Sequence, residues 1–371
     1  MINWEKYSHQ PTEENIFEYP TILDILKEFV SSEEKRDRTK LPLGPKDFAY
    51  NWTEPGYFLL IRDRLINSIA LAPTSRTPKT FFRGQSCYYE KCLPSLFRCT
   101  DKDQEREELK AHLQTMEMGL IMFYHPVVKF INETPIDFNG LGKITFGPNL
   151  EGIAQHYGIK TRLLDFTNDI WAAAFFASTS YDGTYMPIII SDESVFSQRY
   201  GVLYRIDCDY HDGRDCNNDN IYPIGLQYFN RPGKQSGYAR LMDDHKNLHE
   251  VENLKKIFFR HDNKASNLIF MLSQFGNRYI PRDSLAGVVT EICKHDRFCK
   301  ASVDCARKAY YSTMDEEEFR NKVIESGFEI TETLNATFDN QLVIEECNEW
   351  NNGERERFIN NVLYLPMSRL K

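Results

Sequence analysis

The sequence predicts an α+β protein whose core is a mixed, mostly antiparallel sheet with flanking helices. Three observations support this fold class. The run "GVLYRID" alternates between its two faces, which is typical of a strand. The run "DIWAAAFFAS" is apolar almost all round, which indicates a deeply buried helix. Helical patterns occupy both ends of the chain, so we expect helical N- and C-terminal extensions.

The first seventy residues or so are expected to be helical. Two runs carry apolar residues at helical spacing, one around residues 15–32 and one over residues 57–72. The residues that define the pattern are Ile22, Ile25, Leu26 and Phe29 in the first run and Leu60, Leu65 and Ile69 in the second. Two prolines then interrupt the pattern, and a strand ending at Arg83 follows.

Helices and strands are expected to alternate through the middle of the chain. Residues 104–131 have the spacing of one long helix. "TRLLDF" predicts a short strand, and Thr167 or Asn168 is the expected cap of the buried helix after it. Further strands are expected at "YMPIIIS" and "GVLYRID", a Gly-rich turn at "RPGKQSGY", and a helix within 251–275. The chain from about residue 295 is more polar and is expected to be helical.

Composition limits the possible partners. The chain has 371 residues, of which 41% are hydrophobic and 27% charged, and its formal net charge is −9. This charge does not favour general binding to nucleic acid or to a membrane surface, although a local basic patch could still contact nucleic acid. We therefore expect no membrane partner.

The cysteines and the N-terminus predict a cytoplasmic protein. The nine cysteines have no zinc-site spacing, and an odd number indicates free thiols in a reducing compartment. The first twenty residues contain no apolar run of the kind found in signal peptides. The most apolar stretch, "WAAAFFA", is too short to span a bilayer. We predict no bound metal.

The first candidate for chemistry is the run "FFRGQS". Its two phenylalanines and Arg83 are arranged like a buried strand that delivers a positive charge to a rim. Gly84 permits a close approach to the backbone, and Gln85 adds hydrogen-bonding groups. A planar guanidinium suits a phosphate or a carboxylate, whereas a structural ion pair or a cap on a carbonyl oxygen is the alternative interpretation.

The second candidate is the run "QHYGIKTRLLDFT", which is dense in polar side chains directly before the buried helix. Its polar residues are Gln155, His156, Tyr157, Lys160, Thr161, Arg162, Asp165 and Thr167. The start of a helix is a natural anion site because free amides point outward there. In the structural alternative, Arg162 pairs with Asp165 and Thr167 only caps the helix.

The third candidate is "RPGKQSGY", which places Arg231, Lys234 and Gln235 among glycines. The order of its residues is not that of a phosphate-binding P-loop. An ordinary surface turn is the alternative interpretation.

Taken in this order, the three runs resemble the FRG domain, a bacterial and phage domain named for its aromatic-Arg-Gly motif. "FFRGQ" resembles the naming motif, and "AQHYGIKTRLLDFTNDIWAAAFFA" resembles the central signature. "RPGKQSGY" is similar to the Arg-x-x-x-Gln-x-Gly element, and "RYIPRDSLAGV" to the closing segment. The resemblance implies an FRG domain over residues 78–295, between a helical extension at 1–77 and a mostly helical one at 296–371.

The order of the motifs also resembles that of ADP-ribosyltransferases. Those enzymes place an arginine at the end of the first core strand, then a polar strand that runs into a small-residue helix, then usually a glutamate. Arg83, "TRLLDFT" with "AAAFFA", and "RPGKQSG" occur in the same order, with Gln235 in place of the glutamate. This resemblance implies an ADP-ribosyltransferase-like sheet and NAD as the substrate.

The implied function is an ADP-ribosyltransferase-like enzyme that uses NAD, modifies an unidentified macromolecule and acts as a bacterial or phage toxin or defence effector. The expected catalytic residues are Arg83, His156, Arg162, Asp165 and Gln235. The expected NAD-binding residues are Arg83, Gly84, Gln85, Tyr157, Thr161, Thr167 and Arg231, with the nicotinamide stacked on Tyr157 or Phe166.

Two other functions stay open. The first is a non-catalytic sensor of a nucleotide or a nucleic-acid end, whose site would contain charges that are already paired. The second is a phosphate-ester hydrolase or transferase in which two arginines hold phosphate and His156 is the acid or base. An enzyme requires Arg83, His156, Arg162 and Asp165 to converge in one cleft, so we expect Arg83 to lie close to the segment "TRLLDFT".

Overall fold

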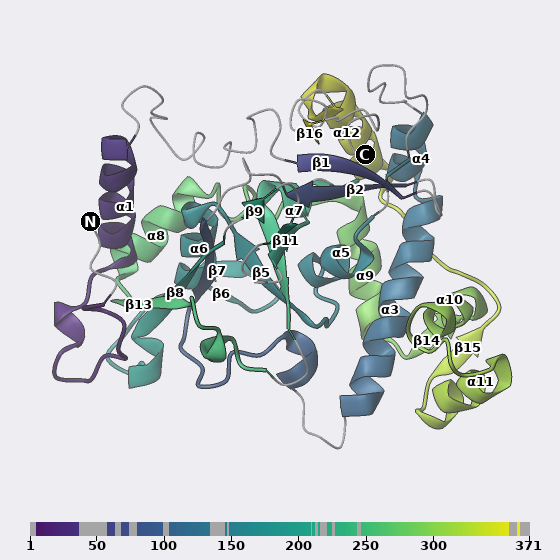
Figure 1. The fold of residues 1–371 in the computed structure, drawn as a ribbon, viewed down its shortest axis with the longest axis horizontal. Helices are drawn as coiled ribbons and strands as arrows, with labels where there is room; N and C mark the ends of the chain where they lie inside the picture. Colours follow the sequence, from purple (N-terminus) through teal and green to yellow (C-terminus); the bar gives the residue numbers. More distant parts are fainter. Residues whose placement is uncertain are drawn as a thin grey trace.

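A computed structural model describes most of the chain (Figure 1). The described residues are 5–36, 58–63, 68–73, 80–98, 104–133, 145–146, 148–208, 210–211, 214–215, 221–224, 227–242, 246–355 and 362–363. None of the helices in these ranges is long and apolar enough to cross a bilayer.

A six-stranded sheet forms the centre of the molecule. Its strands, in spatial order, are β11 (Ile221–Pro223), β12 (Gly237–Leu241), β5 (Leu163–Thr167), β3 (Thr80–Gln85), β8 (Tyr200–Asp207) and β13 (Lys255–Arg260). Every pairing within this sheet is antiparallel. The expected α+β class with an antiparallel core is therefore confirmed.

The sheet is divided in the middle. β3 pairs with β8 along its whole length, and β5 pairs with β12 in the same way. Between β3 and β5, by contrast, the register contains the single pair Phe82↔Thr167. Two three-stranded halves therefore meet at one point and diverge on either side of it.

One face of the sheet is covered by helices. These are α6 (Ile170–Ser178), α1 (Ile22–Arg36) and α8 (Asn263–Leu272), which lie together in Figure 1. α6 is buried and packs on Phe82, Leu203 and Phe259, as its composition predicts. The contact is so close that a Cβ atom at Gly84 would lie 1.9 Å from the carbonyl oxygen of Ala173.

The opposite face carries a second core of large aromatic and aliphatic side chains. Phe81, Tyr204 and Tyr238 from the sheet belong to it. Short segments cover it, including the 3₁₀ helices η1 (Ile16–Glu18) and η5 (Leu248–Glu250). Among the described residues, layers of α-helices therefore cover one face of the sheet, and shorter segments cover the other.

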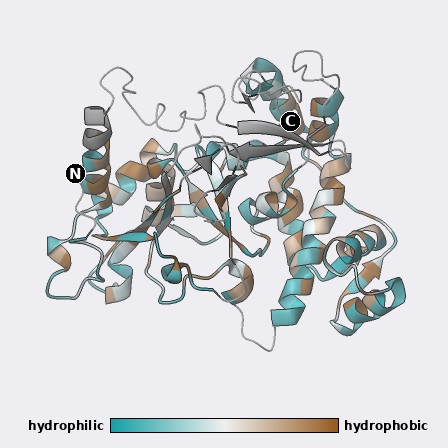
Figure 2. Cartoon of the chain, in the orientation of Figure 1, coloured by the Kyte–Doolittle hydropathy of each residue, from teal (hydrophilic) through white to brown (hydrophobic). Residues whose placement is uncertain are grey.

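A bundle of helices continues the molecule beyond β5 and β12. It consists of α3 (Gln104–Tyr124), α4 (Pro126–Glu133), α5 (Leu150–His156), α7 (Asn230–Lys234), α9 (Ser284–Lys294) and α12 (Asn340–Glu349), followed by the π-helical turn η6 (Trp350–Glu354). α3, α4, α5 and α9 bury apolar residues in one core, which also contains Tyr157, Phe229 and Trp350, and α12 packs partly buried side chains against it. In Figure 2 the first turns of α3 are hydrophilic and its later turns are more apolar.

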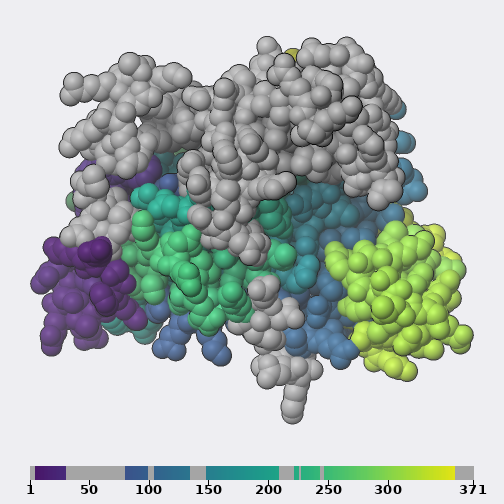
Figure 3. All heavy atoms as spheres, viewed as in Figure 1, coloured from purple at the N-terminus to yellow at the C-terminus, as the bar shows by residue number. Residues whose placement is uncertain are grey.

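The C-terminal part contains strands as well as the expected helices. β14 (Arg297–Cys299) and β15 (Glu329–Thr331) pair in parallel, and α10 (Lys300–Tyr310) and α11 (Glu316–Glu325) lie between them in the chain. Their apolar residues pack on Leu109 and Leu113 of α3. Figure 3 shows this part as a lobe beside α3.

Smaller elements complete the described fold. A four-stranded sheet contains β16 (Val362–Leu363), β1 (Phe58–Asp63), β2 (Ser68–Pro73) and β4 (Thr145–Phe146), with parallel pairs at both edges. Two hairpins are β6 (Thr179–Tyr181) with β7 (Tyr185–Pro187), and β9 (Tyr210–His211) with β10 (Arg214–Asp215). The remaining 3₁₀ helices are η3 (Ser95–Arg98) and η4 (Phe196–Gln198).

Several predicted elements were wrong. Residues 57–72 contain the antiparallel strands β1 and β2 instead of a helix, because two short apolar runs separated by polar residues fit strands as well. The helix expected within 251–275 is β13 followed by α8, since Lys255–Arg260 pairs with β8. Leu65 and residues 37–57 lie outside the described residues.

Other predictions needed smaller corrections. The long helix predicted at 104–131 breaks at His125, before Pro126, into α3 and α4. The cap of α6 is Asp169, whose carboxylate accepts a hydrogen bond from the Trp171 amide at 2.8 Å. The predicted strand at 185–191 covers only β7. The strand carrying Arg83 ends two residues later than expected.

Candidate functional site

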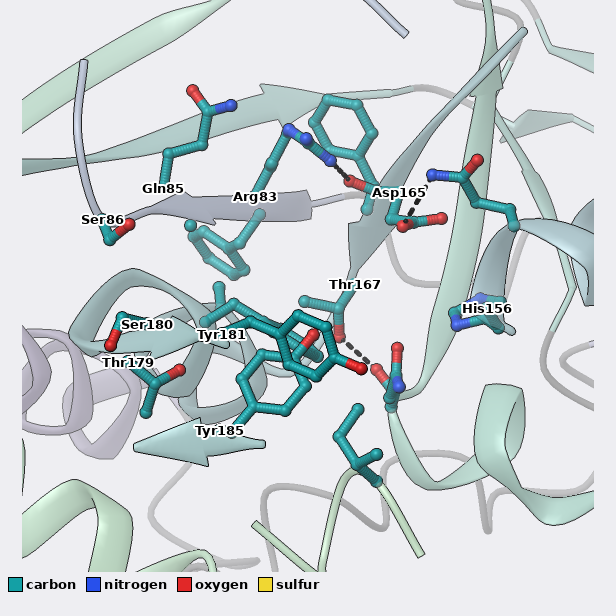
Figure 4. A pocket seen from close by; sticks show the side chains of 18 of the residues that line it. Arg83, Gln85, Ser86, His156, Asp165, Thr167, Thr179, Ser180, Tyr181 and Tyr185 are labelled. Atoms are coloured by element: carbon teal, nitrogen blue, oxygen red, sulfur yellow. Dashed lines mark hydrogen bonds between the residues drawn. The ribbon is translucent and has the colours of Figure 1, made fainter. Parts of the chain in front are cut away.

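A cavity of about 500 Å³ opens where β3 and β5 diverge (Figure 4). β3 and the residue after it contribute 82–86, and β5 contributes 165–167. In Figure 4, Arg83 and Asp165 lie across the cavity from Tyr181 and Tyr185, and His156 lies at one end. The gap in the sheet thus brings together side chains from separate runs of the sequence.

Arg83 reaches from β3 to the backbone of β5. Its Nη1 donates a hydrogen bond to the carbonyl oxygen of Asp165 at 2.9 Å, so the predicted closeness of Arg83 to this segment is confirmed. Extending the register beyond Phe82↔Thr167 would bring Gly84 opposite Asp165, but the strands are no longer paired there. The Nε atom of Arg83 is buried and has no hydrogen-bond partner.

Arg98, at the end of η3, adds a second guanidinium to the cavity wall. Its Nε donates to the carbonyl oxygen of Leu93 at 2.9 Å. Burial and the positive charge of Arg83 both lower the pKa of Arg98. An arginine keeps its proton in proteins, so two positive charges share one wall.

Asp165 contributes a carboxylate with one free oxygen. Its Oδ2 accepts a hydrogen bond from the Gln155 side-chain amide at 3.2 Å, whereas its Oδ1 is buried and has no partner. Gln155 is oriented in turn by the Thr161 hydroxyl, which donates to its Oε1. Thr161 therefore acts on the Asp165 carboxylate through Gln155 and does not line the cavity itself.

His156, the last residue of α5, lines the cavity with its ring. Its Nε2 is buried and makes no hydrogen bond of normal geometry. A Cβ atom at Gly237 would lie 2.9 Å from this nitrogen, so the glycine leaves space for the ring. Burial lowers the pKa of His156, and Asp165 partly opposes that effect. The ring is therefore neutral at neutral pH.

Thr167 and Gln235 line the cavity, and their hydrogen bonds also link β5 to the turn that precedes β12. The Thr167 hydroxyl donates to the main-chain oxygen of Gln235 at 2.7 Å and accepts from the Asp169 amide at 2.9 Å. The Gln235 side-chain amide donates to the carbonyl oxygen of Tyr279 at 3.0 Å. Both side chains are thus held firmly in place.

Two tyrosines from the hairpin β6–β7 line the side opposite Arg83. The ring centroids of Tyr181 and Tyr185 are 4.8 Å apart. Tyr181 is 66% exposed, whereas burial raises the pKa of Tyr185 to about 12. Gly183 has a φ of 77° in the turn between them, a conformation that favours glycine. The tyrosines offer flat apolar surface at the edge of the cavity.

The structure divides the residues that the sequence singles out. Nine of them line the cavity: Arg83, Gly84, Gln85, Gln155, His156, Asp165, Phe166, Thr167 and Gln235. Tyr157, Thr161, Arg162 and Arg231 do not. Arg162 pairs with Glu151 at 3.4 Å instead of with Asp165, and Tyr157 stacks on Arg231 instead of facing the cavity.

Arg98, Tyr181 and Tyr185 are among the cavity residues that the sequence reasoning missed. Arg98 follows an apolar run that carries no recognisable motif. Tyr181 and Tyr185 flank "DGT", and a turn signal between apolar flanks could have predicted their hairpin. Within the described residues, no group of three or more His, Cys, Asp and Glu could hold a metal ion.

The two strands that meet at the divided sheet, together with α6 and β6, lie in the part of the chain that one family model matches. The family model of the FRG domain matches residues 78–184. The FRG match thus contains the naming motif, the central signature and the hairpin turn, whereas Gln235 lies beyond it. No curated protein and no solved structure is significantly similar to this chain.

Proposed function

We propose that the cavity of the FRG domain binds NAD and that the protein is an ADP-ribosyltransferase-like enzyme. One observation carries this proposal: three residues that line one cavity each have a buried polar side-chain atom without a hydrogen-bond partner, namely Arg83 Nε, Asp165 Oδ1 and His156 Nε2. Leaving such an atom unsatisfied costs about 1–3 kcal/mol. A ligand with complementary polar groups would recover that free energy.

The two arginines favour a ligand that carries phosphate. Arg83 and Arg98 are close enough for the charge of one to lower the pKa of the other, so an anion between them relieves their repulsion. A guanidinium also matches the geometry of phosphate oxygens. We assign the pyrophosphate of the dinucleotide to this wall.

The remaining walls suit the rest of a dinucleotide. The volume of about 500 Å³ lies inside the range of roughly 300–1,000 Å³ typical of small-molecule sites. Tyr181 and Tyr185 supply aromatic surface for a flat ring, whereas the Phe166 ring is buried in the core of the opposite face. The free Oδ1 of Asp165 is an acceptor, which suits a ribose hydroxyl.

The proposed chemistry is transfer of the ADP-ribosyl group. Bound NAD would supply that group, with nicotinamide leaving together with the electron pair of the broken carbon–nitrogen bond. Asp165 is the one carboxylate among the described residues that line the cavity, and we assign it the stabilisation of positive charge on the ribose. Neutral His156 accepts the proton that the acceptor loses as its bond to the ribose forms.

Gln235 has a supporting role in this proposal. It stands where the third motif of ADP-ribosyltransferases usually has a glutamate, but its side-chain amide is bonded to Tyr279. A neutral amide cannot balance positive charge as a carboxylate does. The acceptor is a macromolecule in our proposal, and the role of toxin or phage-defence effector follows from the family resemblance alone.

The test is release of nicotinamide from NAD by the purified protein in the presence of a cell extract, together with detection of a modified macromolecule. Asp165→Asn keeps the size of the side chain and removes its charge. We expect it to slow nicotinamide release on the order of 100-fold while NAD affinity changes little.

Asp304→Asn is the matched control, because Asp304 lies on α10 and does not line the cavity. Wild-type protein that binds NAD without releasing nicotinamide would favour the sensor function. Absence of NAD binding would contradict the proposal as a whole.

A further inference from the structure

Behind the cavity wall lies a buried cluster of Tyr157, Arg231 and Asp283. The Arg231 guanidinium stacks 4.3 Å from the centre of the Tyr157 ring, and its Nε lies 3.6 Å from Asp283 Oδ2. The Tyr157 hydroxyl donates to the same oxygen at 2.6 Å. None of the three residues lines the cavity.

Arg231 also contacts the backbone of two segments that carry cavity residues. Its Nη1 donates to the carbonyl oxygen of His156 at 3.4 Å, and its Nη2 donates to that of Pro281 at 3.3 Å. Pro281 directly follows Ile280, another cavity residue. Arg231 itself lies in the short helix α7 that leads into Gln235. One guanidinium thus joins α5, α7 and the start of the 281–283 segment.

We propose that Arg231 is a positioning residue, which holds His156 and Gln235 together as one wall of the cavity. Arg231 and Gln235 are one helical turn apart, with the guanidinium in the cluster and the amide in the cavity. In the Arg-x-x-x-Gln element, the arginine would then hold in place the glutamine that follows four residues later. The expected loss of NAD affinity rests on the proposed function, whereas the expected loosening of the cavity wall does not.

A simple deletion of the Arg231 side chain is a poor test. It would leave the buried Asp283 carboxylate without its positive partner, and such a charge strongly destabilises a fold. The double variant Arg231→Met with Asp283→Asn removes both charges. The asparagine oxygen would still accept the hydrogen bond from the Ala286 amide, so the cap of α9 is kept, while its amide nitrogen would donate to the Tyr157 hydroxyl.

Two further variants complete the set. Asp283→Asn alone keeps the contacts of Arg231 with the His156 and Pro281 oxygens and serves as the control. Arg231→Lys keeps a positive charge beside Asp283 but loses the planar fork that reaches two carbonyl oxygens. If the double variant fails to fold, the lysine variant alone tests whether Arg231 positions the cavity wall.

The measurements are melting temperature, hydrogen–deuterium exchange and NAD affinity on wild type and these three variants. In the double and lysine variants we expect faster amide exchange in residues 150–158 and 229–237 than in wild type, whereas the Asp283→Asn control should exchange there like wild type. NAD affinity should fall on the order of tenfold through misplacement of the wall.

Unchanged exchange in both segments of a folded double or lysine variant would overturn the positioning role. Failure of wild-type protein to bind NAD would contradict the proposed function instead. In that case the exchange data, which need no ligand, would still decide on Arg231.

Discussion

At the scale of single residues, the close contact between α6 and β3 explains why a glycine, Gly84, follows Arg83. A Cβ atom there would lie 1.9 Å from the Ala173 carbonyl oxygen and 2.8 Å from the Ala177 Cβ. The closest neighbour is backbone and cannot swing away. The glycine therefore lets α6 pack against β3 beside the cavity.

We expect Gly84→Ala to destabilise the protein by about 3 kcal/mol or more, because helix and strand must separate. The measurement is the free energy of unfolding from denaturant titration. Gly287→Ala is the matched control, since a Cβ atom there has no neighbour within 4 Å, and it should be neutral or slightly stabilising. Equal stabilities of the two variants would refute this explanation.

Asp169 gives a second residue-scale prediction, this time for pH. Burial raises its pKa from 3.8 to about 6, against the opposing effects of the Trp171 amide and Arg278. The folded state therefore binds a proton more tightly than the unfolded state, and stability falls by roughly 3 kcal/mol as pH rises from about 4 to about 6.

Asp169→Asn should remove this dependence, because asparagine also caps a helix and does not ionise. We expect the melting temperature of the variant relative to wild type to rise between pH 4 and pH 7. If the difference in melting temperature between variant and wild type stays constant from pH 4 to pH 7, the raised pKa of Asp169 is contradicted.

The side chains that the sequence could identify are those fixed by local motifs. Arg83 and Asp165 stand in short runs with strong patterns, and both line the cavity. Arg162 could not be placed, because its partner Glu151 comes from α5 and only the fold brings the two together. The position of Arg231 behind the wall likewise depends on Asp283, which is 52 positions away in the sequence.

At the scale of elements, α6 was the most predictable helix because it is apolar on every side. Ala173, Ala174 and Ala177 are all buried against the sheet and its covering helices. By contrast, the segment containing β13 carries an apolar run that fits a helix or a strand, and only its pairing with β8 decides between them.

We expect Ala174→Leu to overpack this contact and to cost roughly 1–3 kcal/mol. Differential scanning calorimetry measures the effect, with Ala301→Leu on the exposed side of α10 as the control. A melting temperature equal to that of wild type would mean that α6 can shift away from the sheet without cost.

At the scale of the whole molecule, the divided sheet creates the cavity. The strand order β11-β12-β5-β3-β8-β13 follows from long-range pairings that local patterns do not encode, so the single link between β3 and β5 could not be predicted. The net charge of −9 likewise does not predict that one cavity wall carries two arginines. The divergence of the strands and this local charge together define the candidate site.

The most direct test of this account is NAD affinity and melting temperature measured on wild type, Arg83→Lys and Arg83→Ala. We expect the alanine variant to lose about 1.5–3 kcal/mol of binding free energy, with a smaller loss for lysine, while both keep a melting temperature near that of wild type. Added salt should weaken binding by wild type more than by the alanine variant. An alanine variant that melts early and still binds NAD like wild type would contradict the account, because Arg83 would then only support the fold.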